Sequence, residues 1–92
     1  MKVQILGCHG PYPIAGGATS GYLISHRGEN ILMDCGSGIL GKLLALCDPA
    51  SLTAVLLSHL HFDHASDLLV LSYLLQVRGK KLTVYVPPED DS

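Results

Sequence analysis

An apolar segment near the middle of the chain most constrains the fold. Residues 52–58 are apolar on both strand faces in their central four positions, which is typical of a central strand in a covered sheet. A segment of helical periodicity follows at residues 65–78 and ends at Gly79, and a strand-like segment follows at 82–86. Strand, helix and strand in this order form a crossover unit with parallel strands, which predicts the α/β class.

The rest of the chain adds three strands and a shorter helix. Residues 27–30 form a hairpin-type turn that joins two strands into an antiparallel pair. Gly- and Pro-rich residues 8–17 form a loop, and Asp48-Pro49 stops the shorter helix. In full, we expect strands at residues 2–7, 18–26, 30–34, 52–58 and 82–86, helices at 39–47 and 65–78, and a loop at 59–64. The predicted architecture is a mixed β-sheet with two helices.

The length of 92 residues allows a single domain. Apolar residues make up 48% of the chain and charged residues 15%, which excludes intrinsic disorder. An apolar excess on so short a chain suggests that part of the surface is covered, either by a partner chain or by a second half. We therefore interpret residues 1–92 as a single domain or half-domain.

Charge and cysteine content limit the function classes. The net charge is −2 and no basic run exceeds Lys80-Lys81, so the chain shows no dedicated nucleic-acid-binding patch. No apolar run approaches the roughly 20 residues of a membrane span, and we expect no membrane association. Cys8, Cys35 and Cys47 are odd in number and form no CxxC pair. This predicts packing cysteines without a disulfide framework, in a cytoplasmic protein.

A cluster of metal-ligating side chains directly follows the central strand. Three histidines and one aspartate fall within six residues: His59, His61, Asp63 and His64. Side chains two apart in extended backbone point the same way, so the first two histidines can converge on one point. Asp63 and His64 can face a second point, where the chain turns into the helix. This donor set suits zinc, with iron or manganese as alternatives. The alternative to a metal site is that Asp63 caps the helix and the histidines are polar loop residues.

Three stretches resemble a known family. His59 to His64 reads HLHFDH, which matches the HxHxDH signature of the metallo-β-lactamase superfamily of metal-dependent hydrolases. Residues 31–38 resemble the strand-end Asp-x-Gly segment that precedes this signature, and residues 5–11 resemble the opening of the ribonuclease Z-like branch. The resemblance implies that the chain is the N-terminal half of a four-layer αββα sandwich.

The resemblance also implies a role for each candidate residue. His59 and His61 match ligands of the first of two zinc ions, and Asp63 and His64 match ligands of the second. Asp63 is also the expected catalytic residue, because it would orient the attacking hydroxide. Asp34 matches a carboxylate that lies behind the ligands and supports the metal loop, residues 59–64. The alternative for Asp34 is a turn aspartate after a strand.

The implied activity is metal-assisted hydrolysis. A zinc-bound hydroxide would attack a phosphodiester, in a small molecule or in RNA. A thioester or another acyl group is the alternative substrate. The family's later ligands lie in its second half, and no histidine follows His64 in this chain. The rival hypothesis is therefore a truncated, metal-binding, oligomeric fragment without turnover.

Self-association is expected on the same grounds. In the family fold the sheet of the first half packs on the sheet of the second, so an apolar sheet face would be bare in this chain. We expect this face to comprise Val3, Ile5, Leu23, Leu32, Val55 and Leu57. A second copy can cover such a face, which predicts a two-fold homodimer.

Overall fold

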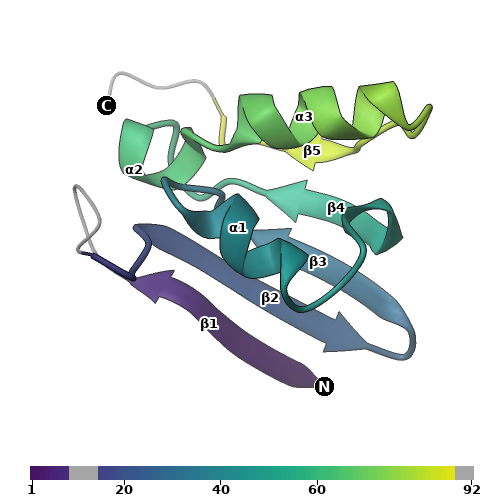
Figure 1. The fold of residues 1–92 in the computed structure, drawn as a ribbon, viewed down its shortest axis with the longest axis horizontal. Helices are drawn as coiled ribbons and strands as arrows, with labels where there is room; N and C mark the ends of the chain where they lie inside the picture. The colour runs from purple at the N-terminus through teal and green to yellow at the C-terminus, as the bar shows by residue number, and fades with distance from the viewer. Residues whose placement is uncertain (9–14, 89–92) are drawn as a thin grey trace.

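Five strands form one mixed sheet in the computed structural model, which describes residues 1–8 and 15–88 (Figure 1). The strands, in their order across the sheet, are β1 (Lys2–Cys8), β2 (Ser20–His26), β3 (Glu29–Met33), β4 (Leu52–Leu56) and β5 (Val84–Tyr85). β1, β2 and β3 pair antiparallel, whereas β4 pairs parallel with both β3 and β5. The sheet therefore joins an antiparallel meander to the predicted crossover unit.

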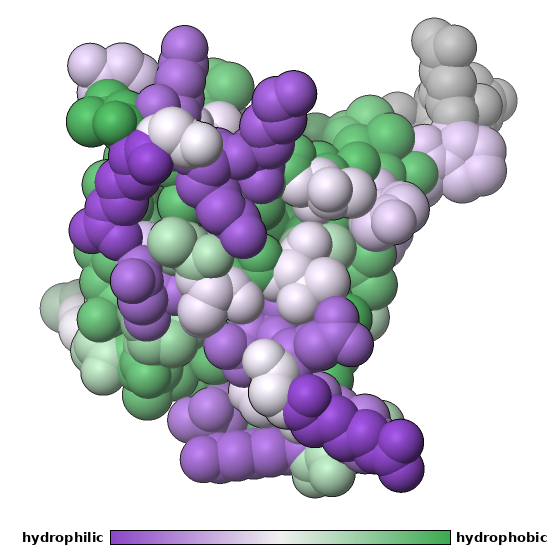
Figure 2. All heavy atoms as spheres, turned by 90° about the vertical axis from the view of Figure 1, so that its right-hand side faces the viewer, coloured by the Kyte–Doolittle hydropathy of each residue, from purple (hydrophilic) through white to green (hydrophobic). Residues whose placement is uncertain are grey.

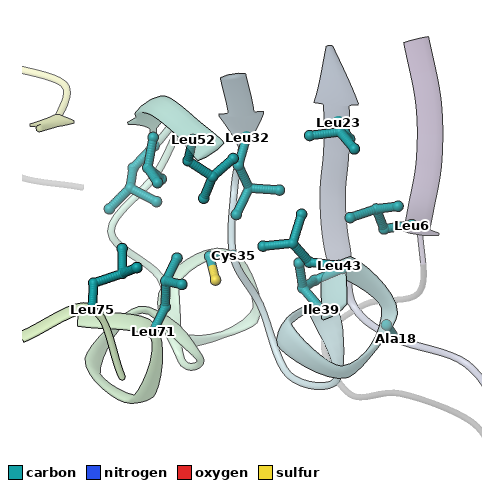
Figure 3. Close-up of a cluster of buried hydrophobic side chains, with 12 residues drawn as sticks. Leu6, Ala18, Leu23, Leu32, Cys35, Ile39, Leu43, Leu52, Leu71 and Leu75 are labelled. Atoms are coloured by element: carbon teal, nitrogen blue, oxygen red, sulfur yellow. The ribbon is translucent and has the colours of Figure 1, made fainter. Parts of the chain in front are cut away.

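The helices gather on one face of this sheet (Figure 1). They are α1 (Ile39–Leu44), the 3-10 helix η1 (Pro49–Ser51), α2 (Phe62–Ala65) and α3 (Leu68–Val77). Leucines from the strands, such as Leu23 and Leu32, pack with Ile39 of α1 and with Leu71 and Leu75 of α3 (Figure 3). These side chains are almost completely inaccessible to solvent. The core is thus a single layer between the sheet and its two longer helices.

A close approach of α1 to β2 depends on Gly21. A Cβ atom at this position would stand 2.5–2.8 Å from three side-chain atoms of Ile39. Gly38, which precedes α1, has a φ of 87°, a left-handed conformation that glycine adopts at little cost. These two glycines allow the short helix to turn away from β3 and then lie against the sheet.

The segment after β4 differs from the sequence-based prediction. The loop expected at residues 59–64 becomes helical at Phe62, and the helix expected at 65–78 is divided into α2 and α3. Ser66 and Asp67, between the two helices, form hydrogen bonds to the segment before and within α1. The prediction was wrong here because apolar periodicity continues through a break that these tertiary hydrogen bonds impose.

The sheet face that stays open also differs from the expected one. Val3 and Ile5 are 58% and 68% exposed, but the other four expected members are buried beneath the helices: Leu23, Leu32, Val55 and Leu57. The strand register explains the difference, since paired residues share a face and Val3 pairs with Ile24 rather than with Leu23. Two rows of side chains cross the open face: Val3, Ile24, Ile31 and Ala54, and Ile5, Tyr22, Met33, Leu56 and Tyr85.

Polar side chains cover much of the end of the molecule that carries the β2–β3 turn (Figure 2). Figure 2 views the end that carries the β2–β3 turn and shows hydrophilic residues gathered there, with hydrophobic atoms along the flanks. The end that carries α2 lies opposite (Figure 1). Within the described residues, every helix is too short or too polar to cross a bilayer.

Candidate metal centre

The carboxyl ends of β3 and β4 meet at the sheet edge beside α2 (Figure 1). These strands are parallel neighbours, so the residues that follow them lie next to one another. Asp34 follows β3, and its backbone N–H donates to the carbonyl of Leu56 in β4 at 2.7 Å. Residues 58–64 leave β4 at the same edge. The topology therefore brings Asp34 against the histidine-rich segment, although 24 residues separate Asp34 from Ser58.

The carboxylate of Asp34 is the buried centre of a hydrogen-bond network. Asp34 is only 3% exposed. Its Oδ1 accepts from the backbone N–H of Ser58 at 2.8 Å, and its Oδ2 accepts from the Ser58 hydroxyl at 2.8 Å and the Ser20 hydroxyl at 3.2 Å. His64 Nδ1 lies 2.9 Å from the same Oδ2. Asp34 adopts a φ of 66°, a left-handed conformation in which Asp is enriched among non-glycine residues.

The charge state of Asp34 determines the tautomer of His64. Burial raises the pKa of the Asp34 carboxyl, but hydrogen bonds from His64 and Ser58 outweigh burial, so the pKa lies below its ordinary value. Asp34 is consequently ionised at neutral pH and can only accept hydrogen bonds. Nδ1 of His64 must therefore carry the proton that it donates to Asp34. In this tautomer Nε2 is the ring atom with a lone pair for a metal ion.

Three histidine rings come together beside Asp34. The ring centroids of His59 and His61 are 5.8 Å apart, and those of His59 and His64 are 4.8 Å apart. Two imidazoles on one tetrahedral zinc ion, with Zn–N distances of about 2.0–2.1 Å, would have centroids roughly 5 Å apart. The rings of His61 and His64 thus both lie within 5.8 Å of the His59 ring, and imidazole is a ring type that zinc binds.

The described side chains do not form a complete metal site by themselves. Among residues whose side chains are described, no three His, Cys, Asp or Glu side chains form a group that could hold an ion. Asp63 lies in α2, but its side chain is outside the described part of the structure. The structure thus brings together His59, His61, His64 and Asp34, while ligation by Asp63 stays a prediction.

Sequence reasoning missed the contribution of two serines. The Ser58 hydroxyl contacts both carboxylate oxygens of Asp34 and lies 3.1 Å from His59 Nδ1 and 3.4 Å from His64 Nδ1. Ser20 reaches Asp34 from β2. Ser58 immediately precedes the histidine cluster, which was an available signal for its role. Nothing local to Ser20 indicated one, because only the sheet brings β2 beside Asp34.

Cys35 does not belong to the ligand set. It is fully buried, as predicted, and burial raises the pKa of its thiol to about 12, with the negative charges of Asp67 and Asp34 acting in the same direction. Its side chain lies in the buried hydrophobic cluster of the core, with residues such as Leu71 and Leu75 (Figure 3). At neutral pH Cys35 is thus a small packing residue in the core.

Comparison with known proteins finds a matching family model and similar proteins of greater length. Residues 14–87 match the family model of the metallo-beta-lactamase superfamily. The probable metallo-hydrolase YhfI of Bacillus subtilis is 46% identical over 77 residues, which make up 84% of this chain and 32% of that protein. Its crystal structure superposes with a TM-score of 0.92 and 41% identity, over 96% of this chain and 36% of that one.

Ribonuclease Z proteins are also similar. The ribonuclease Z of Mycolicibacterium gilvum is 39% identical over 69 residues, 74% of this chain and 24% of that protein. The short form of human tRNase Z shares the fold, with a TM-score of 0.73 and 22% identity, over 98% of this chain and 48% of that chain. The chain spans about a third or less of the length of the curated relatives named here.

Proposed function

The chain belongs to the metallo-beta-lactamase superfamily, and from this membership we propose that it forms the metal-binding part of a zinc-dependent hydrolase. One observation carries the proposal. Three histidine rings gather at one sheet edge, and the buried carboxylate of Asp34 orients one of them, His64. Imidazole ligands held by a carboxylate behind them recur in zinc sites.

We assign a separate role to each residue. His59 and His61 hold a first ion, and Asp63 and His64 hold a second, with zinc as the metal and manganese or iron as alternatives. Asp34 keeps Nδ1 of His64 protonated and so presents Nε2 to the metal. Bound zinc would lower the pKa of a water molecule toward neutrality, which allows attack on a substrate at neutral pH. Asp63 orients that attack.

We propose a phosphodiester, in a small molecule or in RNA, as the substrate class of the whole protein. The similarity to ribonuclease Z of Mycolicibacterium gilvum supports this choice. A thioester or another acyl group is the second candidate, because the superfamily model does not distinguish between these substrates. A third hypothesis for the function is a metal-binding fragment without turnover. It rests on the segment His59 to His64, which contains four of the expected ligands, while the described residues add none.

Metal analysis combined with hydrolysis assays tests these assignments. Zinc content would be measured on the 92-residue chain and on a longer protein that contains it, together with hydrolysis of a nitrophenyl phosphodiester and of a thioester. We expect zinc on both, and hydrolysis of the phosphodiester by the longer protein. His61→Ala should lose zinc. His26→Ala is the matched control, because His26 is an exposed histidine at the far end of β2.

Each outcome of these assays decides between the candidates. A wild-type chain that binds no zinc, or an unchanged zinc content in the His61→Ala variant, would refute the metal site. Hydrolysis of the thioester alone would favour the acyl hydrolase. Zinc on the 92-residue chain, with no hydrolysis of either substrate by this chain or by the longer protein, would favour the fragment hypothesis.

We also propose a homodimer that covers the open sheet face. The two rows of apolar side chains on that face, which include Ile5 and Ile24, would otherwise meet water. Ile5→Lys should therefore give a monomer in light scattering. Leu69→Lys is the control, since Leu69 lies on α3 and is 81% exposed. A wild-type chain that is monomeric at micromolar concentration would contradict the dimer.

A cytoplasmic location completes the proposal. All three cysteines carry free thiols in the structure, although Cys8 is exposed. Free thiols persist in reducing compartments. Localisation by microscopy of the tagged protein would test this, and an extracellular signal would contradict it.

A further inference from the structure

The metal loop passes through a helix that is too short to hold its own position. α2 has four residues, Phe62–Ala65, and carries both Asp63 and His64. A helix of this length is unstable in isolation, because the conformational entropy lost in ordering its first turn exceeds the stabilisation from its few hydrogen bonds. The position of α2 must therefore come from contacts with other elements.

Backbone hydrogen bonds attach the end of α2 to the segment before α1. The N–H of Cys35 donates to the carbonyl of His64 at 2.7 Å, and the N–H of Asp67 donates to the carbonyl of Cys35 at 2.9 Å. We call this contact between residues 35–40 and 64–67 the seam. The seam fixes the backbone position of His64, which the proposed function identifies as a metal ligand.

Side chains extend the seam from Cys35 to α1. The hydroxyls of Ser37 and Ser66 are 2.7 Å apart. Asp67 Oδ2 accepts from the N–H groups of Gly38 and Leu40, each at 3.0 Å. Both bonds are charge-assisted, and such bonds are shorter and stronger than those between neutral groups. Asp67 thus supplies a charged acceptor at the end of the seam that lies against α1.

The usual role of an aspartate at this position does not account for Asp67. It occupies the N-cap of α3, but its side chain makes no capping hydrogen bond there. Gly38, at the N-cap of α1, has no side chain with which to cap that helix. Asp67 therefore satisfies the amides at the start of α1 across the fold, and in doing so joins α1 to the segment that follows His64.

We propose that Asp67 is a positioning residue of the metal centre, a role that rests on the proposed function. The carboxylate ties residues 64–67 to the start of α1 and so determines where α2 lies along the sheet edge. Asp34 then orients the ring of His64 through Nδ1. His64 is consequently held from two directions, at its backbone by the seam and at its ring by Asp34.

Two measurements on the 92-residue chain test this role. The first is the affinity for Zn²⁺ in competition with a chromophoric chelator, and the second is the ¹⁵N NMR spectrum of the His64 ring without metal. Asp67→Ala should weaken zinc binding by about tenfold, the lower end for residues that act behind metal ligands. It should also change the His64 ring signals. Asp67→Asn keeps an oxygen acceptor without the charge, so both readouts should lie between those of Asp67→Ala and the wild type.

Two further variants separate positioning from general stability. Asp48→Ala removes another carboxylate that caps a short helix, since Asp48 accepts from Ala50 at the start of η1. It should leave zinc affinity unchanged. In the Asp67→Ala/Gly41→Ala double variant, alanine at an open helical position strengthens α1 without restoring the lost bonds. Its zinc affinity should stay low even if its stability recovers.

The outcomes distinguish this inference from the proposed function. If the wild-type chain binds zinc and Asp67→Ala binds it equally well, the positioning role is refuted and the metal site stands. Recovery of zinc affinity in the double variant would reduce Asp67 to a stabiliser of α1 and would also refute the role. If the wild-type chain binds no zinc, the proposed function fails, and unchanged His64 ring signals in Asp67→Ala would refute the positioning as well.

Discussion

Replacement of Asp34 separates its contribution to stability from its contribution to metal binding. Asp34→Ala removes a buried carboxylate that accepts from Ser58, Ser20 and His64, and it leaves these donors without their acceptor. A buried donor that is left without its acceptor costs about 1–3 kcal/mol. The φ of 66° adds about 1 kcal/mol, because alanine is disfavoured in the left-handed region. Against a total stability of about 5–15 kcal/mol, this variant approaches unfolding.

Asp34→Asn is therefore the informative substitution. Asparagine tolerates the left-handed conformation, and its amide oxygen can still accept from the backbone N–H of Ser58. The amide nitrogen, however, would oppose the Nδ1–H of His64 where a carboxylate oxygen accepted it before. We expect a loss of about 1–2 kcal/mol in the free energy of unfolding. Zinc affinity should fall by about 10–100-fold, because the preferred tautomer of His64 is no longer stabilised.

Urea unfolding of the metal-free chain and zinc titration against a chelator measure the two effects. Asp48→Asn is the matched control, since Asp48 is an exposed carboxylate that caps η1 and pairs with Arg78. It should change neither quantity appreciably. An Asp34→Asn variant with wild-type zinc affinity would refute the reasoning and leave Asp34 as a turn residue.

Three further predictions concern the scaffold. The lowered pKa of Asp34 means that its stabilising effect is complete above its ordinary pKa of 3.8 and is lost as the pH falls through the lower folded value. The difference in unfolding free energy between wild type and Asp34→Asn should accordingly shrink below about pH 4, and a constant difference would contradict this. In the native chain iodoacetamide should label exposed Cys8 but spare Cys35, whose burial raises its thiol pKa to about 12; mass spectrometry would show any labelling of Cys35 that argues otherwise. Gly21→Ala should destabilise the chain by about 1–3 kcal/mol through overlap with the Ile39 side chain, whereas Gly41→Ala, with open space around it, should stabilise it by up to about 1 kcal/mol in thermal unfolding; the opposite order would refute the packing argument.

Local sequence determined the order of elements and the chemistry of the candidate site. The apolar run before His59 predicted β4, and the order of strand, helix and strand over residues 52–86 predicted the crossover. The HxHxDH spacing pointed to a metal loop, and the likeness of residues 31–38 to a family segment pointed to Asp34, which the structure places against His64. The strand, the crossover and the histidine cluster were predictable because each depends on residues that are close together in the chain, whereas only the family resemblance indicated Asp34.

Tertiary structure decided which surfaces meet. Both faces of β1 to β4 carry apolar residues, so alternation alone could not indicate which face the helices cover. Val3 and Ile5 were therefore predicted to share a face with Leu23, although they lie on the opposite face of the sheet. The division between α2 and α3, and the tie from Asp67 to Gly38, were equally hidden. Strand register and the seam both depend on hydrogen bonds between segments that are distant in the chain. Their pairing depends on the balance of all such contacts at once, and no local pattern of residues encodes that balance.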